Sequence, residues 1–147
     1  MSSQLPADFQ LHIEKRIDID APLAVAFASL LEQLGPANET PHGPMPMKLE
    51  DWPGGRWYRD LGDNTGHFWG HVQVIKPPTL LEIAGPMFMS YAAASHVQYR
   101  LTSEGTGTRL TLTHTALGKI LPQHREGVSS GWEYMLSVVK KIAGSRR

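Results

Sequence analysis

The 147-residue sequence contains no cysteine, which excludes disulfide bonds, cysteine-ligated zinc and a thiol nucleophile. It also lacks an excess of charge of either sign, because 14 lysines and arginines balance 14 aspartates and glutamates. Without net positive charge there is no general attraction to nucleic acid or to an anionic membrane. The composition therefore predicts neither a nucleic-acid partner nor membrane insertion.

Long apolar runs are missing as well. Residues 1–10 lack the basic start and apolar stretch of a secretory signal, and no later run reaches the length of a membrane span. These features are typical of a cytoplasmic protein. With 41% hydrophobic residues the chain can bury the core of one domain. We expect this domain to span residues 1–147, with an N-terminal extension over 1–10 and a basic tail over 144–147.

The most prominent feature that is present is an amphipathic segment from Pro122 to Ala143. Its apolar residues recur at helical spacing: Val128, Trp132, Met135, Leu136, Val139, Ile142 and Ala143. A helix of this length is about 30 Å long. Only a sheet offers so long a surface to cover, so the segment predicts a long C-terminal helix packed on a sheet.

The rest of the chain supplies that sheet. Leu11 to Asp20 alternates apolar and polar residues as a strand does, and Leu23 to Leu34 has helical spacing that ends at Gly35. Gly35 to Pro46 is rich in proline and glycine, which is typical either of a lid or entrance or of an ordinary surface excursion. Turn residues then separate six predicted strands: Met47–Asp51, Arg56–Leu61, His67–Lys76, Leu80–Gly85, His96–Thr102 and Arg109–Thr115.

This order predicts an α+β fold. The elements run β-α-(short α or loop)-β(5–6)-α, and a curved antiparallel sheet of about six or seven strands wraps round the long C-terminal helix. Where such a sheet curves more than the helix can fill, a cavity remains that accepts small apolar ligands.

Several motifs resemble one superfamily when they are taken in order: Ile17–Pro22, Pro53–Arg56, Gly70–Pro78 and Gly131-Trp132. From about residue 11 to residue 143 the chain resembles the SRPBCC or START-like (Bet v 1-like) helix-grip superfamily. Within it, the chain looks like the branch of the C-terminal domain of the heat-shock-protein ATPase activator homologue. The resemblance implies a groove between sheet and helix. It does not imply one activity, because this scaffold serves lipid carriers, hormone binders, cyclases and chaperone cofactors.

Strand parity and the C-terminal helix predict a groove lined by Trp57, Arg59, Phe68, Val72, Val74, Met87, Tyr99, Leu112, His114, Trp132 and Met135. Aromatic rings and methionines suit a flat or oily ligand. Two polar members leave alternatives open. His114 points inward and needs either a protein partner or a ligand. Arg59 either enters the groove, where it can bind a carboxylate, or faces outward while Tyr58 points in.

Metal and cofactor chemistry find little support in the sequence. His67 and His71 would lie about 13 Å apart on a strand, too far to share a metal. Phosphate-binding, dinucleotide-binding and nucleophile motifs are missing, so no cofactor is expected.

The favoured function is non-catalytic binding of a small hydrophobic molecule in the groove. One alternative is an interaction module of the chaperone-ATPase-activator type, with a chaperone or a second copy of the chain as partner. The other is a cyclase-like or hydratase-like enzyme that uses His114, Tyr99 or an inward Glu133 for acid–base work.

Overall fold

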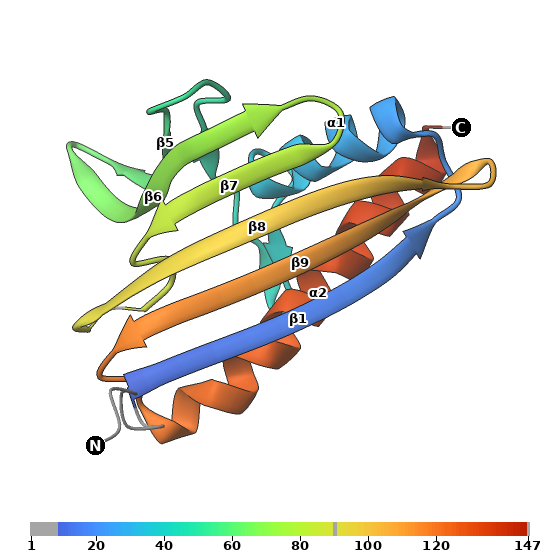
Figure 1. The fold of residues 1–147 in the computed structure, drawn as a ribbon. Helices are drawn as coiled ribbons and strands as arrows, with labels where there is room; N and C mark the ends of the chain where they lie inside the picture. Colours follow the sequence, from blue (N-terminus) through green and yellow to red (C-terminus); the bar gives the residue numbers. More distant parts are fainter. Residues whose placement is uncertain (1–8, 90, 147) are drawn as a thin grey trace, which may run out of the picture.

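The computed structural model describes residues 9–89 and 91–146, and it places two helices on one face of a seven-stranded antiparallel sheet (Figure 1). The elements are β1 (Gln10–Ile19), α1 (Leu23–Leu34), β2 (Glu39–Thr40), β3 (Gly43–Pro44), β4 (Lys48–Leu49), β5 (Arg56–Gly62), β6 (Thr65–Lys76), β7 (Leu80–Gly85), β8 (Ala93–Glu104), β9 (Gly107–Gly118) and α2 (Pro122–Ser145). The sheet order is β1-β9-β8-β7-β6-β5-β4, while β2 and β3 form a separate hairpin. The predicted helix-grip architecture is confirmed.

Helix α2 continues to Ser145, which lies within the predicted basic tail over residues 144–147. Residues 1–8 of the predicted N-terminal extension, and Arg147 of the tail, lie outside the described residues. None of the helices in the described part of the chain combines the length and hydrophobicity that a membrane span requires.

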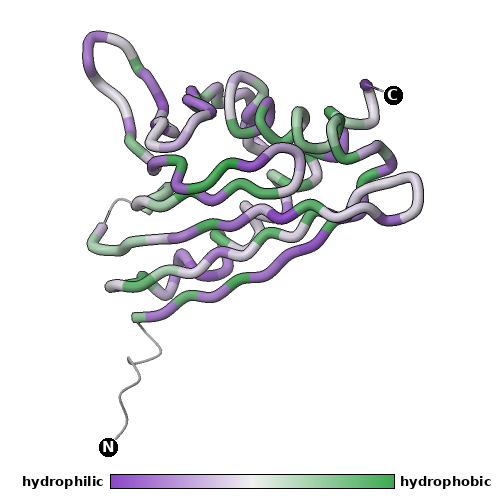
Figure 2. Tube along the Cα trace, turned by 45° about the horizontal axis from the view of Figure 1, so that its top comes forward, coloured by the Kyte–Doolittle hydropathy of each residue, from purple (hydrophilic) through white to green (hydrophobic). Residues whose placement is uncertain are grey.

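Strands β8 and β9 keep the alternation that their sequences predict, which is visible along the strands in Figure 2. Three inward pairs are all buried: Val97 with His114, Tyr99 with Leu112, and Leu101 with Leu110. Because successive side chains of a strand point to opposite faces, these pairs form a continuous apolar row against the helices.

Helix α2 covers that row with the apolar face predicted from its sequence, except that Val138 is buried where Ile142 was expected to be. Its buried residues are Val128, Trp132, Met135, Leu136, Val138, Val139 and Ala143. Val138 is buried although the simple stripe omits it, and the predicted Ile142 is only half-buried. Helix α1 packs along α2 and widens the covered surface on this side.

Strand β6 departs from simple alternation at two β-bulges. Its pairing with β5 shifts at Trp69, and its pairing with β7 shifts at Gln73. An extra residue in one strand moves the following side chains to the other face. Trp69 is therefore buried, whereas Phe68 is 43% exposed. Val74 pairs with Glu82 on the outer face of the sheet. Of the predicted set Phe68, Val72 and Val74, only Val72 is buried between the sheet and the helices.

Two glycines allow β6 and β7 to approach closely beside these bulges. A Cβ atom on Gly85 would lie 2.4 Å from Gly70 Cα and 2.5 Å from the Trp69 carbonyl oxygen. Both obstacles are backbone atoms, which cannot rotate away. Glycine at position 85 therefore permits this close approach of the two strands.

We expect Gly85→Ala to lower the free energy of unfolding by about 2 kcal/mol, because the added methyl group must displace backbone. Gly127→Ala is the matched control, since a Cβ at Gly127 of α2 meets nothing within 4 Å. The control should raise the free energy of unfolding by up to about 1 kcal/mol through better helix propensity. Urea denaturation of both variants measures the difference, and equal effects would contradict the close approach.

Candidate ligand-binding site

A buried chain of hydrogen bonds joins α2 to the two central strands. The Trp132 indole N–H donates to His114 Nδ1 at 2.8 Å, and His114 Nε2 lies 2.9 Å from Ser95 Oγ. An indole nitrogen can only donate, so Nδ1 must accept and the ring proton sits on Nε2. His114 therefore donates to the Ser95 hydroxyl. Both ring nitrogens are occupied by protein groups.

The environment keeps this imidazole neutral. His114 and Trp132 are fully buried, and desolvation lowers the pKa of His114 to about 4. At neutral pH His114 carries no charge and has no free nitrogen for a ligand. Within residues 9–89 and 91–146, no group of three histidine, aspartate or glutamate side chains is arranged to hold a metal ion.

The other residues predicted for acid–base work do not join His114. The Tyr99 hydroxyl is buried without a hydrogen-bond partner among the described residues, and burial raises its pKa above the ordinary value. Glu133 faces outward, where its carboxylate lies 2.6 Å from Lys15 Nζ. The prediction of an inward Glu133 is wrong, because the helical stripe places position 133 on the solvent side.

Aromatic side chains fill the space between the sheet and α2. Trp57 meets Trp69 edge-on at 4.9 Å between ring centroids, and Phe88 lies 5.5 Å from both Trp69 and Trp132. The Trp57 indole also donates to the Leu34 carbonyl oxygen at 2.7 Å, which anchors the end of α1. Predicted site residues that form this solid core are Trp57, Val72, Tyr99, Leu112, His114 and Trp132.

One open space lies at the end of this core. A cavity of about 500 Å³ is bordered by β5, β6 and the segment that follows β7, and we call it the mouth cavity. Its walls are largely apolar: Met45, Trp69, Met87, Phe88, Met89 and Tyr91. Arg59, His67, Phe68 and Pro86 complete the lining.

Strand parity predicts only some of the residues that line this cavity. Of the predicted site residues, Arg59, Phe68 and Met87 contribute, whereas Met135 lines a separate space of about 260 Å³ beside β2. Sequence reasoning missed Met45, Trp69, Phe88, Met89 and Tyr91. The alternation of β6 hides Trp69 because of the bulge, and the other four lie in segments without a regular period.

The backbone of Met87, in the wall of the cavity, has an unusual conformation that its surroundings fix. Its backbone has φ of 57°, a left-handed conformation that is uncommon for a residue with a side chain, and its N–H donates to the Trp69 carbonyl at 2.8 Å. Such residues persist where the surroundings fix them, often at ligand sites.

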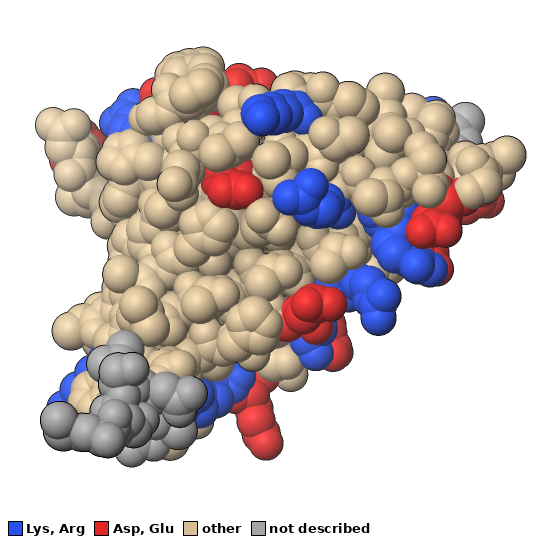
Figure 3. Space-filling view, viewed as in Figure 1, with Lys and Arg blue, Asp and Glu red and all other residues tan. Residues whose placement is uncertain are grey.

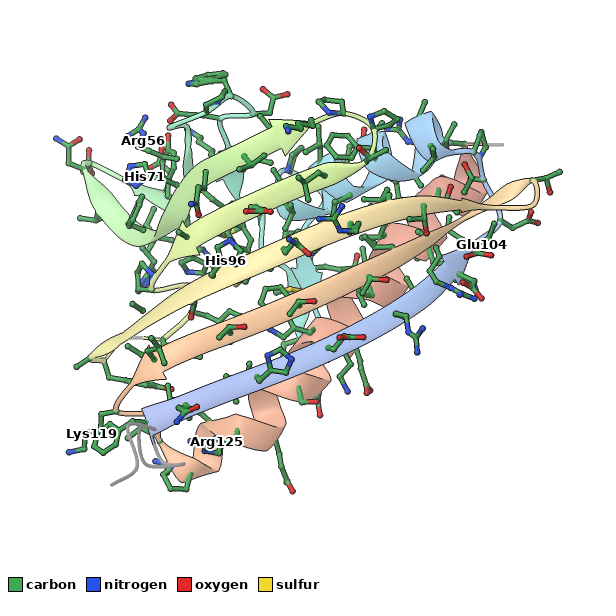
Figure 4. The ribbon with its side chains drawn as sticks, viewed as in Figure 1. Arg56, His71, His96, Glu104, Lys119 and Arg125 are labelled. Carbon is green, nitrogen blue, oxygen red and sulfur yellow. The ribbon has the colours of Figure 1, made fainter. Side chains whose placement is uncertain are left out.

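The outer face of the sheet is different in character. Arg56 and His71 lie side by side on β5 and β6, and His96 projects from β8, where its ring lies 3.1 Å from Glu82 (Figure 4). Lysines, arginines and acids alternate along the edge near β1, so this view shows no continuous basic patch (Figure 3). His71 and His96 therefore have no part in the interior site.

Comparison with known proteins identifies the family of the chain. Residues 28–144 match the family described as Activator of Hsp90 ATPase homolog 1-like protein. The chain belongs to this activator-homologue family. The resemblance to the helix-grip superfamily and to this branch is thereby confirmed. Among curated proteins, no sequence matches the chain.

Solved structures share the fold of this activator-homologue chain at low sequence identity. A protein from Rhizobium leguminosarum is 17% identical with a TM-score of 0.71, over 92% of this chain and 95% of the other. The di-domain ARO/CYC protein StfQ from the steffimycin biosynthetic pathway is 16% identical with a TM-score of 0.68, over 95% of this chain and 52% of the other. Ara h 8.0201 is 11% identical with a TM-score of 0.68, over 92% and 99%. These likenesses establish the fold alone.

The buried imidazole makes the stability of this activator-homologue chain depend on pH. The pKa of His114 is lowered from 6.5 to about 4 on folding, so between these values the unfolded chain binds a proton that the folded chain does not. The free energy of unfolding should fall by about 3 kcal/mol as the pH decreases from about 6.5 to about 4. His114→Gln, which keeps one donor and one acceptor, should lack this part of the slope. Thermal unfolding across the pH range tests this, and identical slopes would refute it.

Two hydroxyl deletions on β8 should have opposite effects. Tyr99→Phe removes a buried hydroxyl without a partner in the described chain, so we expect the free energy of unfolding to stay constant or rise by about 1 kcal/mol. Ser95→Ala leaves the His114 Nε2–H unsatisfied and should lower it by about 1–3 kcal/mol. Chemical denaturation distinguishes the two, and a large loss for Tyr99→Phe would mean that its hydroxyl is bonded.

Proposed function

We propose that this member of the activator-homologue family binds a small hydrophobic molecule in the mouth cavity, in the cytoplasm and without a cofactor. The observation that carries the proposal is an apolar space of about 500 Å³ at the open end of a filled core. This volume lies within the range of about 300–1,000 Å³ typical of small-molecule sites. The ligand would therefore lie beside Trp69 and Phe88, and not deep beside Trp132.

The walls of the mouth cavity supply the affinity in this proposal. Methionine side chains adapt to irregular shapes, and aromatic rings offer flat faces. A ligand that buried about 300 Å² of apolar surface would gain roughly 7 kcal/mol before the cost of immobilisation. This gain comes from apolar burial alone and requires neither a catalytic group nor a metal.

The acid–base alternative has weaker support. A cyclase-like mechanism needs a polar group that can exchange a proton with a ligand. His114 uses both ring nitrogens within the protein, and Glu133 faces solvent. The described site offers no second titratable group next to Tyr99.

The family description favours a second candidate, in which the chain acts on a chaperone through its outer surface. This reading predicts that charge reversals at Glu14 and Arg16, exposed on β1, matter more than changes in the mouth cavity. Stimulation of a chaperone ATPase by the purified protein would support it, and the absence of both stimulation and association would set it aside.

Met45→Glu tests the proposed ligand site. It places a carboxylate against the apolar wall, and we expect at least a tenfold loss of affinity because the charge must be desolvated when a hydrophobic ligand enters. Fatty acids, sterols and flat aromatic compounds can be titrated while tryptophan fluorescence and the unfolding temperature are followed. The native protein should respond to at least one class.

Leu31→Glu is the matched control. Leu31 is also half-buried and apolar, but it lines a different cavity, between α1 and β4–β5. Its substitution should leave ligand affinity unchanged. If the native protein binds none of these compounds, or if only Leu31→Glu weakens binding, the mouth cavity is not the ligand site.

A further inference from the structure

One charged side chain stands in the lining of the mouth cavity. Arg59 follows Trp57 on β5 by two residues, so both side chains leave the strand on the same face. Trp57 is buried in the core, while Arg59 is half-buried farther along the strand and reaches the cavity. Tyr58 lies on the opposite face, beneath the Arg56 guanidinium. The inner register, one of the two considered from sequence, is the one adopted.

Arg59 differs from Arg56 and Arg109, two surface arginines whose guanidiniums are paired. The Arg56 and Arg109 guanidiniums each have a carboxylate at 2.9 Å, from Glu50 and Asp18 respectively. Within the described part of the chain, the Arg59 guanidinium has neither a hydrogen-bond partner nor an ion-pair partner. A half-buried guanidinium has lost part of its hydration, and an anion that binds to it restores the lost interaction.

The lining offers no carboxylate to satisfy Arg59. It contains no aspartate or glutamate, and His67, which pairs with Arg59 across β5 and β6, is its other basic group. On its far side Arg59 borders a depression that Asp60 and Asp63 also line, but neither carboxylate pairs with it. Asp60 instead lies 2.9 Å from Lys48. Apolar walls strengthen the field of the remaining charge.

We propose that Arg59 makes the mouth cavity selective for ligands with an apolar body and an anionic group, such as a carboxylate. This inference rests on the proposed function. The planar guanidinium can donate two parallel hydrogen bonds to such a group. The apolar body then lies against Trp69 and Phe88, while the acid stays at the rim, near His67 and water.

The charge distribution also determines which cavity such a ligand prefers. A larger space of about 750 Å³ lies between α1 and β4–β5, and four acids line it: Glu32, Glu50, Asp51 and Asp60. Lys48 is the one basic residue in that lining. An anionic ligand would be repelled there, so the smaller mouth cavity is favoured despite its size.

Two fluorescent probes with the same apolar body test this selectivity. Anilinonaphthalene sulfonate carries an anionic group, and phenyl naphthylamine lacks it. The native protein should bind the anionic probe at least about tenfold more tightly, the gain typical of one charge-assisted contact. Arg59→Gln should lower the affinity for the anionic probe by about tenfold and leave the affinity for the neutral probe unchanged. The anionic advantage should also shrink as salt is added.

Arg100→Gln is the matched control, because Arg100 is exposed on the outer face of β8, away from the cavity. It should change neither affinity. Equal affinities for the two probes in the native protein, or an equal loss of both in Arg59→Gln, would overturn the role of Arg59 and leave the ligand site standing. Failure of the native protein to bind either probe would instead count against the proposed function itself.

Discussion

The hydrogen bond from Trp132 to His114 is the contact on which the arrangement of the interior depends. It ties the long helix to β9, and the same imidazole continues to Ser95 on β8. A buried donor without a partner costs about 1–3 kcal/mol. The series of hydrogen bonds from Trp132 through His114 to Ser95 therefore fixes both the rotation of α2 and the register of the two strands. The aromatic core then packs around a helix that has one permitted orientation.

That constraint also decides where a guest molecule can lie. Because Trp132 must reach His114, its indole occupies the centre of the groove, and Phe88 packs against it from the segment after β7. The groove that the resemblance implied is thus filled along most of its length. An open space remains at the mouth, where methionines and a half-buried arginine line the cavity together with aromatic rings.

The sequence predicted most of the fold because the relevant signals are local. Alternation along β8 and β9 placed Tyr99 and His114 inside, and helical spacing identified the buried stripe of α2. The same reasoning failed on β6, where two bulges turn Phe68 and Val74 outward and Trp69 inward. A bulge depends on how neighbouring strands pair, and Gly70 and Gly85 were the only local hint of that close approach.

The sequence by itself therefore determined the order of elements, the α+β class and the inward parity of the central strands, since periods of 2 and 3.6 residues are properties of a single segment. Only the tertiary structure decided what His114 binds, that the groove is filled, and that a cavity remains at its mouth. Met45, Arg59 and Tyr91 come from three distant segments to form that cavity. Side chains so far apart in the chain meet only after the sheet has curved round α2, and no local pattern encodes their distance.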